Sequence, residues 1–179
     1  MDFVEFNKIP RLSRNCVVTE KIDGTNASVF ISEDGEFLTG SRTRWITPED
    51  DNYGFSRWAH ANKEDLLKLG PGQHFGEWWG LGIQRNYGLK EKRFSLFNTF
   101  RWSDPAVRPL CCGVVPILYS GDFDTVMISV ALKELAELGS KAAPGFIKPE
   151  GVVIYHEAAR AYFKKTIEKD EEWKGKTQP

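Results

Sequence analysis

Short segments in which apolar and polar positions alternate recur along the chain, and this period of two is typical of strands with one buried face. Other segments are rich in β-branched or aromatic residues, which strands also favour. An Asp34-Gly35 pair lies between two such segments and predicts a tight hairpin turn. We expect strands over residues 16–19, 27–32, 36–41, 73–79, 94–100, 113–119, 151–155 and 161–166.

Two longer segments carry a helical pattern instead. Residues 54–69 form the first, and a Gly-Pro-Gly sequence would end it. In the second, apolar residues recur three and four positions apart, Asp124 or Thr125 can cap the start, and Gly139 suits the end. Many short strands with two substantial helices predict an α+β fold with mainly antiparallel sheet. The apolar positions of the second helix are Met127, Val130, Ala131, Leu135 and Leu138.

The length of 179 residues suits one domain, which would bury about 70% of the surface of the unfolded chain. The composition, 41% hydrophobic and 27% charged, is that of a globular protein. No apolar run approaches the roughly 20 residues of a membrane span, and the start of the chain does not resemble a signal peptide. We expect one domain over residues 1–167, a polar tail over 168–179 and no separate C-terminal domain.

The charges nearly balance, with 24 lysines and arginines, 25 aspartates and glutamates, and a net charge of −1. This balance argues against binding of a polyanion through bulk charge alone. Residues 85–108, however, carry six basic and two acidic side chains and are a candidate path for a nucleic acid. The three cysteines, two of them adjacent, form a poor disulfide framework, so we expect a reducing, cytoplasmic setting and no zinc site.

A lysine beside a turn begins the candidate chemistry. Lys21 ends a predicted strand, the turn-forming pair Asp23-Gly24 follows, and the turn would present one amine at the mouth of a sheet. Four further short motifs follow along the chain, and although each motif is weak alone, five in this order with fitting gaps are a strong signal. The four are Ser41-Arg42, Phe75-Gly76-Glu77, Glu150-Gly151-Val152-Val153 and Lys164-Lys165.

This series of motifs resembles that of the covalent nucleotidyltransferase superfamily, which comprises nucleic-acid ligases and capping enzymes. It resembles the RNA ligase 2 branch most, because the lysine motif ends in Gly-Thr-Asn, whereas the other enzymes usually carry a different residue at the position of Asn26. The resemblance covers the chain from about Thr19 to Thr166. It implies a nucleotidyltransferase (ligase adenylation) domain of the α+β class, with two mainly antiparallel sheets flanked by helices and AMP in the cleft.

The resemblance also implies catalytic roles. Lys21 would attack the α-phosphate of ATP to form a covalent lysine–AMP, and Glu150 would help to organise Mg²⁺ or Mn²⁺. Lys164 and Lys165 would contact phosphates, although neighbours in a regular strand cannot both face the pocket. The simpler alternatives are that Glu150 is a surface residue at the start of a strand and that the two lysines guard an edge strand.

Near the lysine motif, Glu20 would lie at the adenine edge and Asn26 near the reacting strand ends. Asp23 stands where some relatives carry histidine, so its role stays open. Arg42 would contact the AMP phosphate or ribose, with Arg44 as the competitor for that role. Alternatively, both arginines face solvent, since they alternate along a predicted strand.

Two residues farther along the chain complete the nucleotide-binding set that the resemblance implies. Glu77 would accept hydrogen bonds from the ribose hydroxyls, and Phe97 would stack on adenine. A carboxylate in the apolar setting of Glu77 needs a partner, so a structural ion pair is the alternative. The simpler alternative for Phe97 is a core residue.

A lysine nucleophile must first lose its proton. A free lysine has a pKa of about 10.4, so only about one in 2,500 is neutral at pH 7, a handicap of roughly 4.6 kcal/mol. Burial and neighbouring cations lower a lysine pKa, and the candidate cations are Arg42, Lys164 and Lys165. A divalent metal bound with ATP would add to this effect.

We therefore expect an ATP-dependent RNA ligase that joins 3′-hydroxyl and 5′-phosphate RNA ends through a lysine–AMP intermediate. The alternatives are a nick-sealing DNA ligase of the same superfamily and a non-catalytic module that binds nucleotide or RNA. The partners would be RNA ends and no membrane. Because few residues follow Lys165, we expect weak strand capture that an auxiliary protein or a bridging RNA could supply. The sequence leaves the oligomeric state open.

Overall fold

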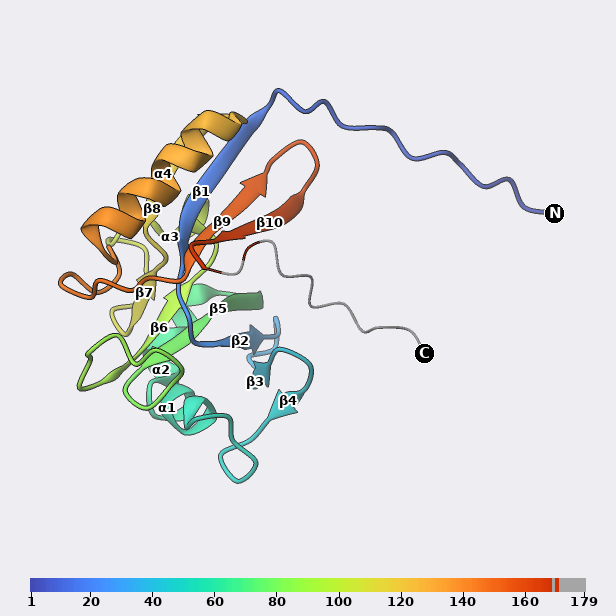
Figure 1. Ribbon diagram of the computed structural model, residues 1–179. Helices are drawn as coiled ribbons and strands as arrows, with labels where there is room; N and C mark the ends of the chain where they lie inside the picture. The colour runs from blue at the N-terminus through green and yellow to red at the C-terminus, as the bar shows by residue number, and fades with distance from the viewer. Residues whose placement is uncertain (169, 171–179) are drawn as a thin grey trace, which may run out of the picture.

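The computed structural model describes residues 1–168 and 170, and it contains two sheets (Figure 1). The first has the order β10-β9-β1-β8, and all its neighbouring strands are antiparallel. Its strands are β1 (Asn15–Lys21), β8 (Ile117–Asp122), β9 (Gly151–His156) and β10 (Ala161–Thr166).

The second sheet has the order β4-β3-β2-β5-β6-β7, and β6 and β7 are its parallel pair. The chain passes directly from β1 of the first sheet into β2 of the second through a short turn, so this turn joins the two sheets (Figure 1). The strands are β2 (Thr25–Ile31), β3 (Phe37–Ser41), β4 (Trp45–Ile46), β5 (Gly72–Gly80), β6 (Lys92–Leu96) and β7 (Cys112–Val114).

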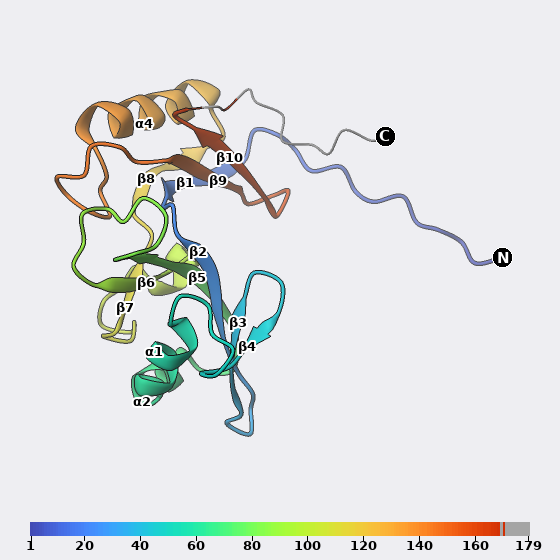
Figure 2. The same ribbon diagram turned by 60° about the horizontal axis from the view of Figure 1, so that its bottom comes forward.

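Helices cover the outer side of each sheet, and the two sheets lie between them (Figure 2). The long helix α4 lies against the four-stranded sheet, and α1 and α2 lie against the six-stranded sheet. The helices are α1 (Phe55–Ala61), α2 (Lys63–Leu66), a 3₁₀ turn η1 (Leu67–Leu69), α3 (Thr99–Trp102) and α4 (Thr125–Leu138).

Alternation along the strands divides each sheet into a face that packs on helices and a face turned away from them, which we call the inner face. In the four-stranded sheet, Val18 and Ile154 pack against Leu135 of α4. In the six-stranded sheet, Val29 and Trp78 belong to the core that includes α1 and α2. Polar residues of the predicted motifs that alternate with these apolar residues are therefore placed on the inner faces.

The expected fold class is confirmed, and so are most strands and the long helix. Asp124 caps α4, because its carboxylate accepts a hydrogen bond from the Val126 amide at 2.7 Å. The expected buried face of α4 was partly wrong, since Leu138 is 78% exposed and Met127 and Val130 are also exposed. The side chains of α4 that are buried are Ile128, Ala131 and Leu135.

Three other expectations were wrong in their boundaries. The strand expected over 94–100 ends at Leu96, because Asn98 caps α3 by accepting a hydrogen bond from a main-chain amide. The strand expected over 113–119 is broken before Pro116 into β7 and β8, which belong to different sheets. The helix expected over 54–69 is interrupted at Asn62 and becomes α1, α2 and η1.

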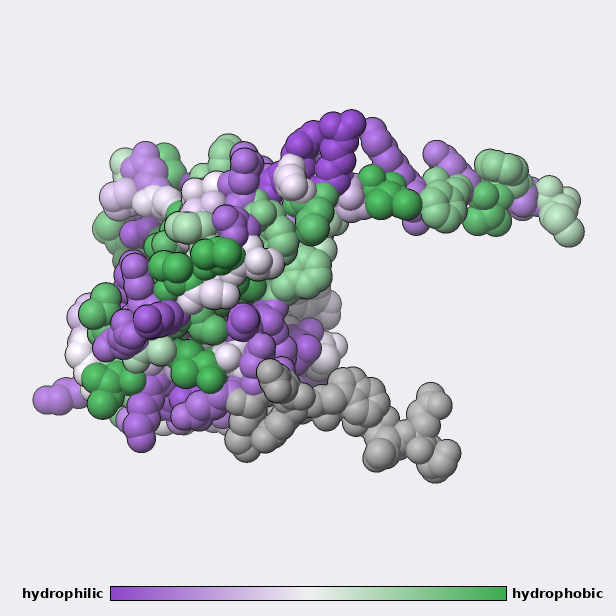
Figure 3. All heavy atoms as spheres, turned by 45° about the horizontal axis from the view of Figure 1, so that its top comes forward, coloured by the Kyte–Doolittle hydropathy of each residue, from purple (hydrophilic) through white to green (hydrophobic). Residues whose placement is uncertain are grey.

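The segment before β1 begins as an extended chain that runs away from the body of the molecule (Figure 3), but Leu12 and Arg14 lie against the body, where their main-chain oxygens are hydrogen-bonded to His156 and Phe123. The polar tail expected over 168–179 lies outside the described residues, apart from Glu168 and Asp170. Within the described part of the chain, no helix combines the length and the apolar character that crossing a membrane would need.

Candidate active site

Lys21 and Glu150 form an ion pair at the end of β1. The Nζ atom of Lys21 donates to Oε2 of Glu150 at 2.6 Å, and the two side chains are 25% and 20% exposed. Strand pairing brings the residues together, because Lys21 lies opposite Gly151, the residue after Glu150. A side chain at Gly151 would clash with the main-chain oxygen of Lys165 in the neighbouring strand. Two predicted motifs, 129 residues apart, thus meet in one site.

Glu77 lies on the inner face of β5, opposite Asn26 of β2. Its Oε1 accepts a hydrogen bond from the Gly24 amide at 3.0 Å, and its Oε2 accepts one from Nδ2 of Asn26 at 3.2 Å. Burial raises the pKa of Glu77 to about 7, although the nearby charge of Lys21 and the bond from Gly24 act in the opposite direction. Its partners are thus hydrogen-bond donors rather than the structural ion pair that was the alternative.

Gly24 lets the turn after Lys21 approach β5 closely. A Cβ atom at this position would lie 2.5 Å from the main-chain oxygen of Trp78 and 2.7 Å from Cβ of Trp79. Only glycine fits such contacts without a shift of the backbone. Gly24, recognised from the sequence as part of a turn-forming pair, is therefore required by the packing of this turn against β5.

Glu20 is buried on the opposite face of β1 from Lys21. Its carboxylate accepts hydrogen bonds from Oγ of Ser140 at 2.5 Å and from the amides of Lys141 and Ala142 at 2.8 and 2.9 Å. The side chain thus fixes the loop that follows α4. The expected contact of Glu20 with the adenine edge stays a prediction.

The turn between β3 and β4 separates the two competing arginines. Both Nη atoms of Arg44 bind the carboxylate of Asp50, at 2.5 and 2.9 Å. Arg42 is exposed, and among the described residues its side chain forms no hydrogen bond or ion pair. Of the two arginines, Arg44 is thus paired, and contact of Arg42 with the AMP phosphate or ribose stays a prediction.

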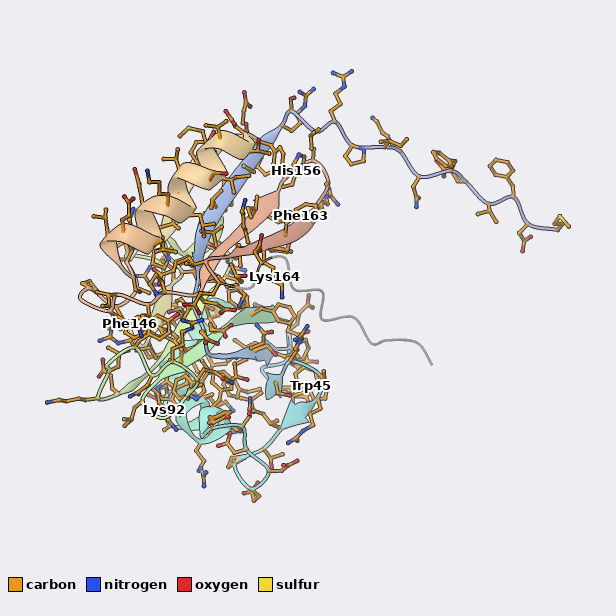
Figure 4. All side chains as sticks on the ribbon, in the orientation of Figure 1. Trp45, Lys92, Phe146, His156, Phe163 and Lys164 are labelled. Carbon is orange, nitrogen blue, oxygen red and sulfur yellow. The ribbon has the colours of Figure 1, made fainter. Side chains whose placement is uncertain are left out.

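Strand register separates the two lysines of β10. Lys164 lies opposite Val153, which in turn lies opposite Thr19, so Lys164 shares the inner face with Lys21. Figure 4 labels Lys164 on this strand. Lys165 lies opposite Val152, a residue of the core under α4. The doubled lysine therefore places one cation, rather than two, on the inner face.

Phe97 follows β6 and is half-buried. Its amide donates to the main-chain oxygen of Phe75 at 3.0 Å, and its ring packs against a cluster that includes Ile22 and Val115. Phe97 therefore packs partly in the core, and the rest of its side chain is exposed. Stacking of Phe97 on adenine stays a prediction.

Arg85 and Tyr87 were missed as site residues from the sequence, where Arg85 counted only as part of the basic stretch. Nε of Arg85 donates to Oδ2 of Asp23 at 2.9 Å, and Nη1 donates to the main-chain oxygen of Lys148 at 3.1 Å. The hydroxyl of Tyr87 accepts a hydrogen bond from the Asp23 amide at 2.8 Å. These contacts hold the turn after Lys21, and no sequence signal indicates them across more than 60 residues.

The comparisons with known proteins concern the family and the fold. The family model described as RNA ligase matches residues 14–169. Among solved structures, Naegleria gruberi RNA ligase is similar in a glutamate-to-alanine mutant with ATP and Mn (TM-score 0.64, 21% identity) and in a lysine-to-methionine mutant with AMP and Mn (TM-score 0.61, 22% identity). Each match covers 87% of this chain and 50% of the other. The chain thus shares their fold over half of their length, and by its family match it belongs to the RNA ligase family.

Proposed function

We propose that this protein is an ATP-dependent RNA ligase that works through a covalent AMP on Lys21. The observation that carries the proposal is the 2.6 Å contact of Lys21 with Glu150, beside the buried Glu77. Membership of the RNA ligase family supports RNA ends as substrates. The similar Naegleria structures that hold ATP or AMP with Mn support the use of a nucleotide and a divalent cation.

The residues present fit a divalent cation held jointly by protein and nucleotide. Among the described residues, no group of three or more histidine, cysteine, aspartate or glutamate side chains could hold a metal ion by itself. Mg²⁺ is usually bound by one or two carboxylates together with substrate phosphates, and Glu150 would supply such a carboxylate. The cation would neutralise charge on the phosphates and favour the neutral form of the attacking amine.

The chain's own residues would position the reactants. Glu150 holds the Nζ atom of Lys21 at the end of β1, so the nucleophile has a fixed direction. Glu77 would accept hydrogen bonds from ribose hydroxyls, and Arg42 and Lys164 would contact phosphates. Positioning of this kind is the main contribution of a protein to phosphoryl transfer.

The reaction would proceed in three steps. The Nζ–phosphorus bond to the α-phosphate forms as pyrophosphate leaves and the amine gives up its proton. An oxygen of the 5′-phosphate of an RNA end then bonds to the phosphorus of AMP, while the phosphorus–nitrogen bond breaks and the amine of Lys21 takes up a proton. Finally, the 3′-hydroxyl of the other end loses its proton, forms the new phosphodiester bond and releases AMP.

A pulse and chase tests this function. The protein is incubated with α-labelled ATP and Mg²⁺ or Mn²⁺, freed of nucleotide, and chased with RNA that carries a 5′-phosphate and a 3′-hydroxyl. We expect a protein label that survives alkali but is lost in acid, as a phosphorus–nitrogen bond requires, and that passes to RNA and is released as AMP when the ends join. A label that never forms would favour a non-catalytic binding module. Faster joining of a DNA nick than of the matched RNA nick would favour a DNA ligase.

A further inference from the structure

Three aromatic side chains gather on the inner face of the six-stranded sheet. Trp45 of β4 is 50% exposed, and Phe75 of β5 is 53% exposed. The ring of Phe30 of β2 lies against Trp45, with 6.0 Å between the ring centroids. Large apolar side chains on a surface mark an interaction site when they are grouped rather than scattered.

Strand pairing places these residues across one face of the sheet, with Trp45 and Phe75 three strands apart. Phe75 lies opposite Ser28 in β2, and Trp45 lies opposite Gly40 in β3. Gly40 itself lies opposite Ser28, and a Cβ atom at Gly40 would come within 3.3 Å of the Trp45 ring. The missing side chain at Gly40 therefore lets the indole lie close to the sheet, where its other side stays open.

The aromatic group is continuous with the candidate active site. Phe75 precedes Glu77 by two residues on the same face of β5, a distance of roughly 7 Å along the strand. At the other end of the group, Arg42 directly follows β3, and Trp45 begins β4 three residues later. Figure 4 shows Trp45 on the lower sheet and Lys164 on the upper one.

The charges around the group favour a polyanion on one side only. Arg42 is exposed, has no ion-pair partner among the described residues and follows β3 at the end nearer the site, and Lys164 lies on the inner face of the other sheet. Three acidic residues, Glu33, Asp34 and Glu36, occupy the hairpin turn beyond Phe30. A bound strand would thus keep its phosphates near the site and end before this turn.

We propose that Phe30, Trp45 and Phe75 form a stacking platform for a few unpaired RNA bases next to the ends that are joined. The proposal rests on the proposed function. Aromatic side chains stack on bases of any sequence and contribute about 1–3 kcal/mol per base. Bases within a duplex already stack on one another, so the platform selects single-stranded RNA at the join.

Binding of a labelled ten-nucleotide single-stranded RNA, followed by fluorescence anisotropy without ATP, tests the platform. We expect Trp45→Ala and Phe75→Leu each to weaken binding roughly 5- to 150-fold, as loss of one stacked base predicts. Trp45→Phe keeps a ring and should stay within a few-fold of the wild type. Phe100→Ala removes a phenylalanine on α3 that is more exposed than Phe75, at 101%, and should have no effect.

Phe75→Leu removes the ring but keeps an apolar side chain, so the protein should still fold. This variant therefore tests the platform even if Trp45→Ala fails to fold. RNA affinity within two-fold of the wild type in Phe75→Leu would overturn the proposal, and so would an equal loss in Phe100→Ala or an equal loss of duplex binding. A wild-type dimer that Trp45→Ala dissociates without a change in RNA affinity would show a protein interface instead. Labelling of the wild type with ATP alone tests the proposed function separately, because that reaction contains no RNA.

Discussion

Arg85 and Asp23 form an ion pair, 2.9 Å between Nε and Oδ2, that ties the turn after Lys21 to the segment before Glu150. The same guanidinium also donates a hydrogen bond to the main-chain oxygen of Lys148, two residues before Glu150, so Arg85 contacts both segments. Both side chains of the pair are less than one-third exposed. Arg85 is therefore a positioning residue for the ion pair of Lys21 and Glu150.

Replacement of Arg85 by alanine should slow the first chemical step more than it lowers stability. The ion pair is partly exposed, so we expect a loss of only about 1 kcal/mol in the free energy of unfolding. The rate of lysine–AMP formation at saturating ATP should fall about tenfold, since a small misplacement of the nucleophile is costly. Single-turnover labelling measures this rate, and Arg85→Lys should recover part of it. The matched control is Arg93→Ala, which removes an exposed pair with Glu91. An equal effect of both variants would contradict the role of Arg85.

Glu77 should make the protein less stable as the pH rises from about 5 to 7. Its pKa in the folded protein is about 7, against an ordinary value of 4.5 for a glutamate side chain, so over this range the folded state binds more protons than the unfolded state. Stability then falls with pH, by up to about 3 kcal/mol over the range for a single group. Glu77→Gln should flatten this part of the profile. Urea unfolding at several pH values measures it, and parallel profiles for both proteins would be the contrary result.

Lys164 and Lys165 should differ sharply in their effect on catalysis. Lys164 shares the inner face with Lys21, whereas Lys165 lies opposite Val152 of the core under α4. We expect Lys164→Ala to slow lysine–AMP formation at least 100-fold, within the range for loss of a charged contact to a transferring phosphoryl group. Lys165→Ala is the matched control, and its rate should change less than about three-fold. Equal losses of rate in the two variants would contradict the prediction that only Lys164 contacts the phosphates.

Binding of RNA should weaken with salt, while labelling by ATP should not. If Arg42 and Lys164 supply two phosphate contacts, affinity for single-stranded RNA should fall about sevenfold between about 50 and 200 mM salt. Arg42→Ala should halve the slope of the logarithm of affinity against the logarithm of salt concentration. Arg44→Ala is the control, because Arg44 is already paired with Asp50. If Arg42→Ala leaves the salt dependence of RNA affinity unchanged, Arg42 does not contact an RNA phosphate.

The features that the sequence predicted well depend on local patterns. Asp124 and Gly139 mark the two ends of α4, and the hairpin at Asp34-Gly35 follows from its turn chemistry. The exposed Leu138 was placed in the buried face because the helical period gives spacing but not the width of the buried stripe. The break in the strand expected over 113–119 was missed, although Pro116, which lacks a main-chain N–H, was the signal for it.

The features that the sequence did not predict depend on contacts that no sequence pattern specifies, whether between distant strands or within one turn. The choice of Lys164 over Lys165 required the register of β10 against β9, and the choice of Arg42 over Arg44 required the position of Asp50. Arg85 contacts a residue 62 positions away, so no spacing rule could reveal it.

The central claim is that Lys21 carries the nucleotide, and identification of the modified residue tests it most directly. The protein is incubated with ATP and Mg²⁺ or Mn²⁺, digested, and its peptides are searched by mass spectrometry for added AMP. We predict AMP on the peptide that contains Lys21, and none in Lys21→Ala or in Lys21→Arg, because arginine keeps its proton near neutral pH. Circular dichroism should show that both variants keep the fold. An AMP adduct on another residue, or substantial adduct formation by either variant, would contradict the assignment.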